Sequence, residues 1–132
     1  MTTLTDTSDM TINVTVWDDP LAAGGLEADS DDALVYLTPI LGPTATLLLH
    51  RLARYLSGEA TGQTWSISEL AASLGVIPST LTASLARLDR FGMIRVTGDR
   101  AQVRTRIPPL SARHVSRLPA YLAVACPYQH GR

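Results

Sequence analysis

At 132 residues, of which 45% are hydrophobic, the chain is long enough for one compact domain with a core. Its single cysteine, Cys126, excludes an internal disulfide framework and any zinc site that is built on several thiolates. The net charge of −1 conceals a strong segregation of charge along the sequence. Residues 1–32 contain eight acids and no Lys or Arg, which gives them a net charge of −8. Residues 33–132 contain eleven Arg and four acids, which gives them a net charge of +7.

Halves of opposite charge are typical of a domain that contacts a polyanion and has an acidic segment able to screen it. Two solvated faces without such a role would give the same pattern, so both interpretations stay open. All eleven basic residues are Arg. Guanidinium groups suit phosphate recognition, but a GC-rich coding sequence would explain the bias equally well.

Residues 1–30 form an acidic N-terminal segment in which we predict one strand, at about 10–17. Apolar side chains occupy every second position there, which is typical of a half-buried strand. A loop follows, and then a short helix or turn at 31–37. Pro39 is expected to end regular structure.

The remaining residues, 31–132, are predicted to form the main domain. Its first long helix opens at Pro43, a residue that suits the first helical position because its missing N–H costs nothing there. Alanine and leucine recur at helical spacing from Ala45 to Leu56, which predicts one buried stripe.

Two further helices are predicted at 66–91, after a short strand at 64–65. Ser66 and Glu69 have the spacing of a capping box, so the second helix should begin immediately after Ser66. Gly75 is expected to end it. Ile77-Pro78 opens the third helix, which should continue to Phe91.

A β-hairpin is predicted within 93–107, because Gly98-Asp99 is a plausible two-residue turn. One face of the hairpin is then entirely apolar, so turn chemistry and side-chain alternation agree. The register pairs Val96 with Ala101 and Ile94 with Val103 on that face, and Thr97 with Arg100, Arg95 with Gln102 and Met93 with Arg104 on the other.

The last predicted element is a C-terminal helix at 111–125, with a kink at Pro119 and an end before Pro127. In total these elements predict an α+β fold that is mainly helical. An N-terminal strand in an acidic segment precedes the helices and the hairpin, and the C-terminal helix follows them.

The helices at 66–91 have the small residue, turn glycine and apolar spacing that hold two helices across each other. The residues from Ser66 to about Ile107, a third of the chain, resemble winged helix–turn–helix regulators of the GntR and MarR type. The resemblance lies in Gly75-Val76, Ser79-Thr80-Leu81, Leu85, Leu88, Gly92 and Ile94. It implies a winged helix–turn–helix fold in which the hairpin at 93–107 is the wing.

The resemblance also implies that the helix from Pro78 to Phe91 enters the major groove with its N-terminal residues nearest the bases. The wing would follow the phosphates. The candidate DNA-binding residues are Ser79, Thr80, Thr82, Ala83, Arg87, Arg90, Arg95, Arg100, Arg104 and Arg106. The chain departs from the family in that Thr and Ala stand where Arg or Lys is often found, which leaves few strong contacts to bases.

The function expected from the resemblance is that of a transcriptional regulator that binds double-stranded DNA, as a homodimer on a two-fold site. The alternative is a winged-helix adaptor in the transcription or replication machinery, whose acidic N-terminal segment meets a protein partner. A third hypothesis joins these two: the acidic segment folds over the Arg-rich wing and competes with DNA.

No catalytic or cofactor chemistry is expected. The sequence shows no nucleophile–base pattern, no glycine-rich phosphate loop and no metal-ligand spacing. His114 beside Arg113 is interpreted as part of a basic surface. The most apolar region, 33–49, contains Pro39, Gly42 and Pro43 and is too short to span a membrane, and no signal peptide precedes it. We therefore expect a cytoplasmic protein without membrane contact.

Overall fold

The computed structural model describes residues 10–22, 24–57 and 62–129, and about half of these are helical. The α+β class is confirmed. The helices are α1 (Asp31–Tyr36), α2 (Thr38–Leu41), α3 (Pro43–Leu56), α4 (Ile67–Ser73), α5 (Pro78–Arg90), α6 (Ala112–Val115) and α7 (Ala120–Ala125), with a 3₁₀ turn at Pro20–Ala22. The strands are β1 (Thr11–Val16), β2 (Leu26–Glu27), β3 (Gln63–Ser66), β4 (Ile94–Thr97), β5 (Arg100–Val103) and β6 (Arg106–Ile107).

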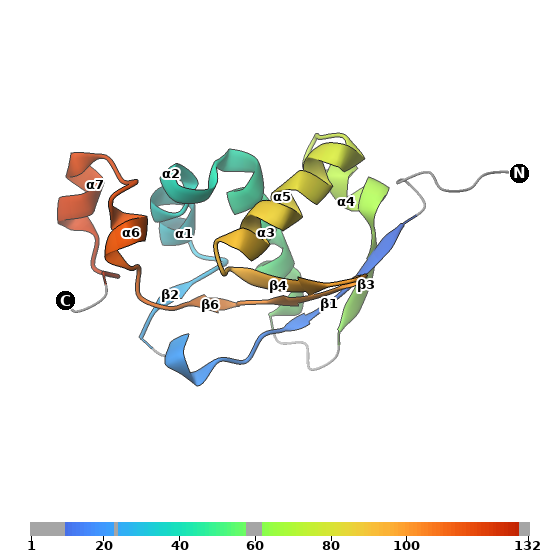
Figure 1. Cartoon of the computed structure of the whole chain (residues 1–132), viewed down its shortest axis with the longest axis horizontal. Coiled ribbons are helices and arrows are strands. Elements are labelled where there is room, and N and C mark those ends of the chain that lie inside the picture. The colour runs from blue at the N-terminus through green and yellow to red at the C-terminus, as the bar shows by residue number, and fades with distance from the viewer. Residues whose placement is uncertain (1–9, 23, 58–61, 130–132) are drawn as a thin grey trace, which may run out of the picture.

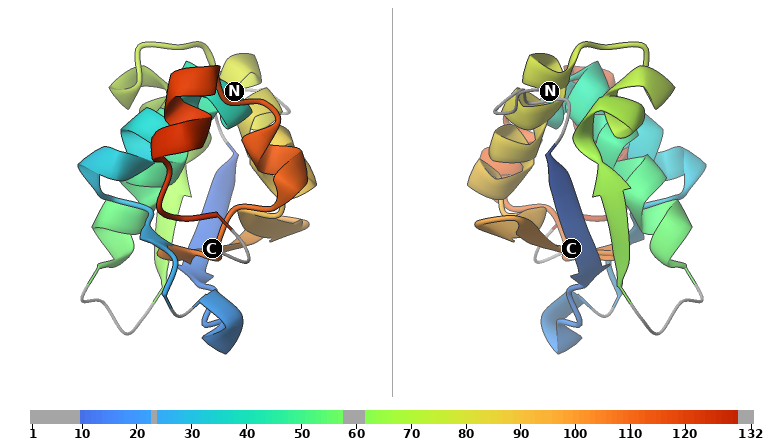
Figure 2. Two further views of the ribbon diagram at one scale, coloured as in Figure 1. Left: turned by 90° about the vertical axis from the view of Figure 1, so that its left-hand side faces the viewer. Right: turned by 90° about the vertical axis from the view of Figure 1, so that its right-hand side faces the viewer.

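Four strands form a mixed sheet in the order β3-β1-β5-β4. The predicted N-terminal strand exists as β1 and lies in the interior of this sheet, antiparallel to β3 and parallel to β5. Asn13 is thereby placed between Thr64 on one side and Arg100 on the other. Figure 2 shows β1 alongside β3. Because both edges of β1 are paired, the N-terminal strand is part of the core sheet and offers no free edge.

The helices pack on one face of the sheet. In Figure 1, α1, α2, α4 and α5 lie above the strands, and α6 and α7 form one end of the molecule. Ile12 and Val14 of β1 and Val103 of β5 point into the core, where all three are at most 4% exposed. Each fully buried aliphatic side chain contributes roughly 1.5–3 kcal/mol. The other face of the sheet carries the alternate, polar side chains.

Helix α3 supplies the largest part of the core, as its sequence spacing predicted. It begins at Pro43 and ends at Leu56. Every member of the predicted stripe is buried, namely Ala45, Leu48, Leu49, Leu52 and Leu56. The stripe prediction is therefore confirmed.

The β4–β5 hairpin has the predicted register. Ile94 pairs with Val103, Val96 with Ala101, and Thr97 with Arg100. Gly98 has a φ of +60°, the left-handed conformation that the first position of this turn requires. The apolar face of the hairpin lies against α5, so its basic and polar side chains project from the opposite face of the sheet.

Two proline predictions need correction. Pro39 does not end regular structure, because it lies within the first turn of α2, where its missing N–H has no intrahelical partner to lose. Pro119 divides the predicted C-terminal helix into α6 and α7 instead of kinking one helix. Its ψ of 157° is extended, so it stands as the N-cap of α7. Helix α7 ends at Ala125, before Pro127, as expected.

The short antiparallel pair β2–β6 was not predicted. Leu26 pairs with Ile107, and Glu27 with Arg106. The approach is close at Gly25, because a Cβ there would lie 1.8 Å from the carbonyl oxygen of Ile107. The pair ties the acidic N-terminal segment to the end of the hairpin.

Candidate nucleic-acid interface

Helices α4 and α5 are joined by a tight turn and meet at an angle of 90°. The Ser66 hydroxyl accepts a hydrogen bond from the N–H of Glu69 (3.2 Å) and caps α4, as the capping-box spacing predicted. Gly75, with a φ of +73°, lets the chain leave α4, and the N–H of Val76 bonds back to the carbonyl of Ala71 (3.0 Å). Ala71 is fully buried, which fits a small residue at a helix crossing.

One face of α5 is buried and the other is presented to solvent. Leu81, Leu85 and Leu88 pack into the core. The exposed side chains of α5 are Ser79, Thr82, Ala83, Ala86, Asp89 and Arg90, while Thr80 and Arg87 are half-buried. We call these exposed residues the outer face of α5. Three of the four residues predicted nearest to DNA bases, Ser79, Thr82 and Ala83, are thus accessible.

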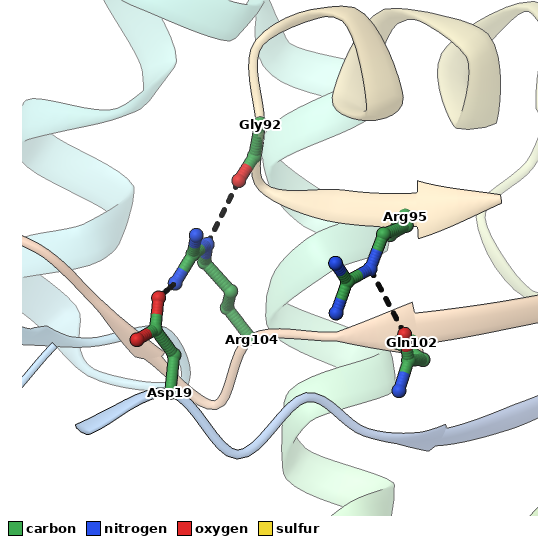
Figure 3. A network of polar contacts seen from close by, with 5 residues as sticks. All are labelled: Asp19, Gly92, Arg95, Gln102 and Arg104. Atoms are coloured by element: carbon green, nitrogen blue, oxygen red, sulfur yellow. Dashed lines mark hydrogen bonds and ion pairs between the residues drawn. The ribbon is translucent and has the colours of Figure 1, made fainter. Parts of the chain in front are cut away.

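Arg104, predicted as a wing contact to phosphate, is held inside a local network (Figure 3). One guanidinium nitrogen lies 2.7 Å from Oδ2 of Asp19, and Nε donates to the carbonyl of Gly92 (2.8 Å). The Arg104 side chain is only 11% exposed and lies 3.7 Å from the centroid of the Trp17 ring. Its charge is therefore largely compensated within the protein.

Arg95 and Arg106 are also engaged. Arg95 donates from Nε to Oε1 of Gln102 (2.9 Å), as Figure 3 shows, and lies 4.2 Å from the Trp17 ring centroid. Arg106 forms an ion pair with Glu27 at 2.7 Å, in a more exposed setting. These contacts leave Arg100, beside the hairpin turn, as the hairpin arginine whose side chain has no hydrogen bond or ion pair within the described part of the chain.

The acidic N-terminal segment supplies several of these internal partners. Asp19 pairs with Arg104, Glu27 with Arg106, and Asp29 lies 3.8 Å from Arg54. The hydroxyl of Tyr128 donates to Asp32 (2.5 Å), and this hydrogen bond is the main cause that raises the pKa of Tyr128. Asp19, Glu27 and Asp29 therefore join the acidic segment to the rest of the domain through ion pairs.

Arg87 and Arg90, the basic residues of α5, differ in their surroundings. Arg87 donates from Nε to the carbonyl of Leu41 (2.5 Å), and its guanidinium lies 5.2 Å from the Phe91 ring centroid. The Arg90 side chain is exposed, and no hydrogen bond or ion pair joins its guanidinium group to any residue that the structure describes. Both side chains line a hollow of about 410 Å³ that also reaches Thr80 and Ala83.

A second hollow, of about 480 Å³, continues from the same two arginines to α6. Its lining includes Arg113, His114 and Arg117 from the C-terminal region. Burial, and then the positive charges of Arg113 and Arg117, hold the pKa of His114 below its usual value. The sequence indicated a basic surface at Arg113 and His114, but not that it would join the end of α5.

The described residues were also searched for metal-ligand groups and for helices that could cross a membrane. No group of three or more His, Cys, Asp or Glu within 10–22, 24–57 and 62–129 could hold a metal ion. Within these ranges no single helix is long and apolar enough to cross a membrane, and α4 with α5 passes that test only as a bent pair.

The chain was compared with known proteins in three ways. No family model matches it, and neither a curated protein nor a solved structure does.

Proposed function

We propose that the chain is a winged helix–turn–helix protein that binds duplex DNA through the outer face of α5. In this proposal α4 and α5 form the helix–turn–helix and the β4–β5 hairpin is the wing. Strand β1 is an addition to the sheet between β3 and the hairpin. The observation that carries the proposal is the exposed outer face of α5, at the end of a tight turn from α4.

The outer face of α5 offers few but suitable contacts to a major groove. Hydroxyl groups of Ser79 and Thr82 can bond to several base edges, and the methyl group of Ala83 can contact thymine. Thr82 donates to the carbonyl of Ser79 (3.0 Å), so its hydroxyl oxygen remains able to accept. Arg90 supplies a positive charge about three turns further along the helix, within reach of a backbone phosphate.

The phosphate contacts of the proposal move from the engaged hairpin arginines to Arg90 at the end of α5, Arg113 of α6 and Arg100 beside the hairpin turn. Arg95, Arg104 and Arg106 are engaged internally. Arg90, Arg100 and Arg113 have no such partner among the described residues. If these three contact phosphates, the logarithm of the binding constant should fall with the logarithm of salt at a slope of about −3.

The proposal is tested by fluorescence anisotropy of a labelled duplex pool at low salt. Ala83→Glu places a carboxylate in the centre of the outer face and should weaken binding by at least about tenfold, because it would approach phosphates and carbonyl groups of bases. Val35→Glu, at an exposed position of α1, is the matched control. Absence of binding by the wild type at low salt would disprove the proposal.

The homodimer also remains a proposal. The candidate contacts are the N-terminal strand and the C-terminal helix. Both edges of β1 are paired, whereas Tyr121 and Val124 of α7 are each 74% exposed and lie three residues apart on one helix, so α7 is the better candidate. Sedimentation analysis of Tyr121→Glu against the wild type would test it. If Tyr121→Glu were still a dimer, the dimer contact would have to lie elsewhere on the molecule.

A protein-interaction adaptor is the second candidate, and one specific observation favours it. An apolar hollow of about 340 Å³ lies between the start of β1, α5 and the hairpin, lined in part by Met10, Ile12, Leu85 and Val96. Met10 is 57% exposed at its rim. Met10→Glu should abolish capture of an adaptor's partner. Thr82 of the outer face of α5 also lines this hollow, so the two functions are distinguished at Ala83, which lies outside it: Ala83→Glu should weaken DNA binding and leave capture of a protein partner unchanged.

A further inference from the structure

The hollow between the end of α5 and α6 has an unusual lining, and we call it the arginine groove. It is formed by the last turn of α5, the turn at Gly92 and the residues of α6 and its C-terminal end. Its volume is about 480 Å³, within the usual range for small-molecule sites. The lining residues are Arg87, Arg90, Phe91, Gly92, Ser111, Arg113, His114 and Arg117.

Four guanidinium groups line the arginine groove, and among the described residues no carboxylate does. The nearby Asp89 is turned away toward the hairpin, where its Oδ1 accepts from the N–H of Val96 (3.4 Å). Arg90 and Arg113 have no ion pair within the described residues. The groove therefore gathers positive charge that the neighbouring protein does not neutralise.

Two of the arginines are positioned by a shared aromatic ring. The guanidinium groups of Arg87 and Arg117 lie 5.2 and 5.1 Å from the centroid of Phe91. Arg87 is further fixed by its bonds to α2, to the carbonyls of Leu41 (2.5 Å) and Ile40 (3.4 Å). Such contacts hold the donors in place before any ligand arrives, which lowers the entropy cost of binding.

His114 responds to the charge in the groove. Burial lowers its pKa, and Arg113 and Arg117 lower it further. Its Nδ1 is buried and has no hydrogen-bond partner among the described residues. A ligand that changes the electrostatic potential in the arginine groove should therefore change the pKa of His114.

We propose that the arginine groove binds a small phosphorylated molecule, one that carries a phosphomonoester or diphosphate group. Planar guanidinium forks match the oxygens of phosphate and can bond to them in pairs. A dianion would compensate charges that the groove leaves unpaired, and the rings of Phe91 and His114 provide walls for the rest of the ligand. Binding itself does not depend on the proposed DNA interaction.

One consequence does rest on the proposed function. Arg90 belongs both to the outer face of α5 and to the arginine groove, so a ligand in the groove would compete with a backbone phosphate for it. Bound anion should then weaken DNA binding by several-fold, beyond what an equal ionic strength of chloride produces.

The experiment is isothermal titration calorimetry with inorganic phosphate and with pyrophosphate, at an ionic strength held constant with sodium chloride. The wild type should bind pyrophosphate more tightly than phosphate. Arg113→Ala should weaken binding by about tenfold, the loss expected for one charged hydrogen-bonding partner. Arg54→Ala, which removes a 71% exposed arginine outside the groove, is the charge-matched control and should change the affinity by less than about twofold.

A second readout locates the ligand without a mutation in the groove. In an NMR titration of the wild type, saturating pyrophosphate should raise the pKa of His114, because the anion offsets the charges of Arg87, Arg90, Arg113 and Arg117. No heat with pyrophosphate, equal losses in Arg113→Ala and Arg54→Ala, or an unmoved His114 pKa would each overturn the proposal. Failure to bind DNA would leave these measurements untouched, so the two proposals can fail separately.

Discussion

Two groups of arginine in this chain show how differently the same side chain can be used. Arg95, Arg104 and Arg106 of the hairpin region are matched by a ring, a carboxylate or an amide of the protein itself. Arg90 and Arg113 of the arginine groove have no such ion pair within the described residues. Charge counted along a sequence therefore does not reveal which charges are available to a partner.

The N-terminal segment explains why the hairpin arginines have partners within the protein. Strand β1 and the residues after it pass along the sheet and bring Asp19 and Glu27 to the hairpin, whereas α6 brings Arg113 to a hollow whose described lining contains no acid. The sequence hypothesis assigned phosphate contacts to the hairpin. The structure supports a different distribution, with the available charge at the end of α5.

The largest effect is expected when the buried ion pair between Asp19 and Arg104 is broken. Asp19→Ala would leave the 11% exposed Arg104 without its carboxylate and should lower the free energy of unfolding by about 2–3 kcal/mol, measured by urea denaturation. Glu27→Ala, at the exposed pair with Arg106, should cost less than about 1 kcal/mol. Equal losses in the free energy of unfolding would show that burial does not determine how much each ion pair contributes to stability.

The next effect concerns DNA binding and contrasts one arginine from each group. Arg90→Ala should weaken binding about five- to tenfold and make the salt slope shallower by about 1, because one phosphate contact is lost. Arg95→Ala should change the affinity by less than about twofold, since Arg95 is engaged with Gln102 and Trp17 on the other face of the sheet. Anisotropy titrations at several salt concentrations measure both values, and the reverse order would restore the hairpin as the phosphate contact.

A smaller effect follows from the low pKa of His114, which burial and the neighbouring Arg113 and Arg117 cause. Above the unfolded-state pKa, about 6.5, the ring is neutral in both states. As the pH falls below that value the unfolded chain takes up the proton first, so the free energy of unfolding decreases until the folded pKa is passed. His114→Gln should show a weaker loss of stability in this acidic window, measured by urea denaturation at a series of pH values. An identical pH dependence of the two proteins would count against a lowered pKa.

The smallest effect, on DNA affinity, is expected when the exposed ion pair between Glu27 and Arg106 is broken. Glu27→Gln removes the carboxylate from Arg106 with little change in shape. Because the proposed interface does not use Arg106 or the other engaged hairpin arginines, DNA affinity should stay within about twofold in anisotropy titrations. A rise of more than about threefold would support the hypothesis that the acidic segment screens a phosphate-binding wing.

Deletion of the acidic segment is not a suitable test of the screening hypothesis, because the segment contains a strand of the core sheet. Deletion of the first thirty residues would remove β1 from between β3 and β5, and with it the buried Ile12 and Val14. Loss of binding in such a deletion would report unfolding. Single substitutions such as Glu27→Gln change the charge and keep the sheet.

Much of the fold could be predicted because its determinants are local. The Gly98-Asp99 turn and the alternation around it predicted the hairpin register, which the structure reproduces at the four pairs from Ile94–Val103 to Thr97–Arg100. The stripe of α3 and the cap at Ser66 follow equally from residues within a few turns of one another. The two prolines were harder, since Pro39 and Pro119 can each begin a helix as readily as end one.

Alternation by itself determined that residues near 10–17 form a half-buried strand and that α5 has one apolar and one polar face. Only the tertiary structure decided that β1 lies between β3 and β5, because a strand's partners depend on hydrogen bonds and packing with segments far away in the sequence. The same holds for the arginines. Whether Arg104 or Arg90 keeps an available charge is decided by which carboxylates the fold brings near, and Asp19 is 85 residues from Arg104.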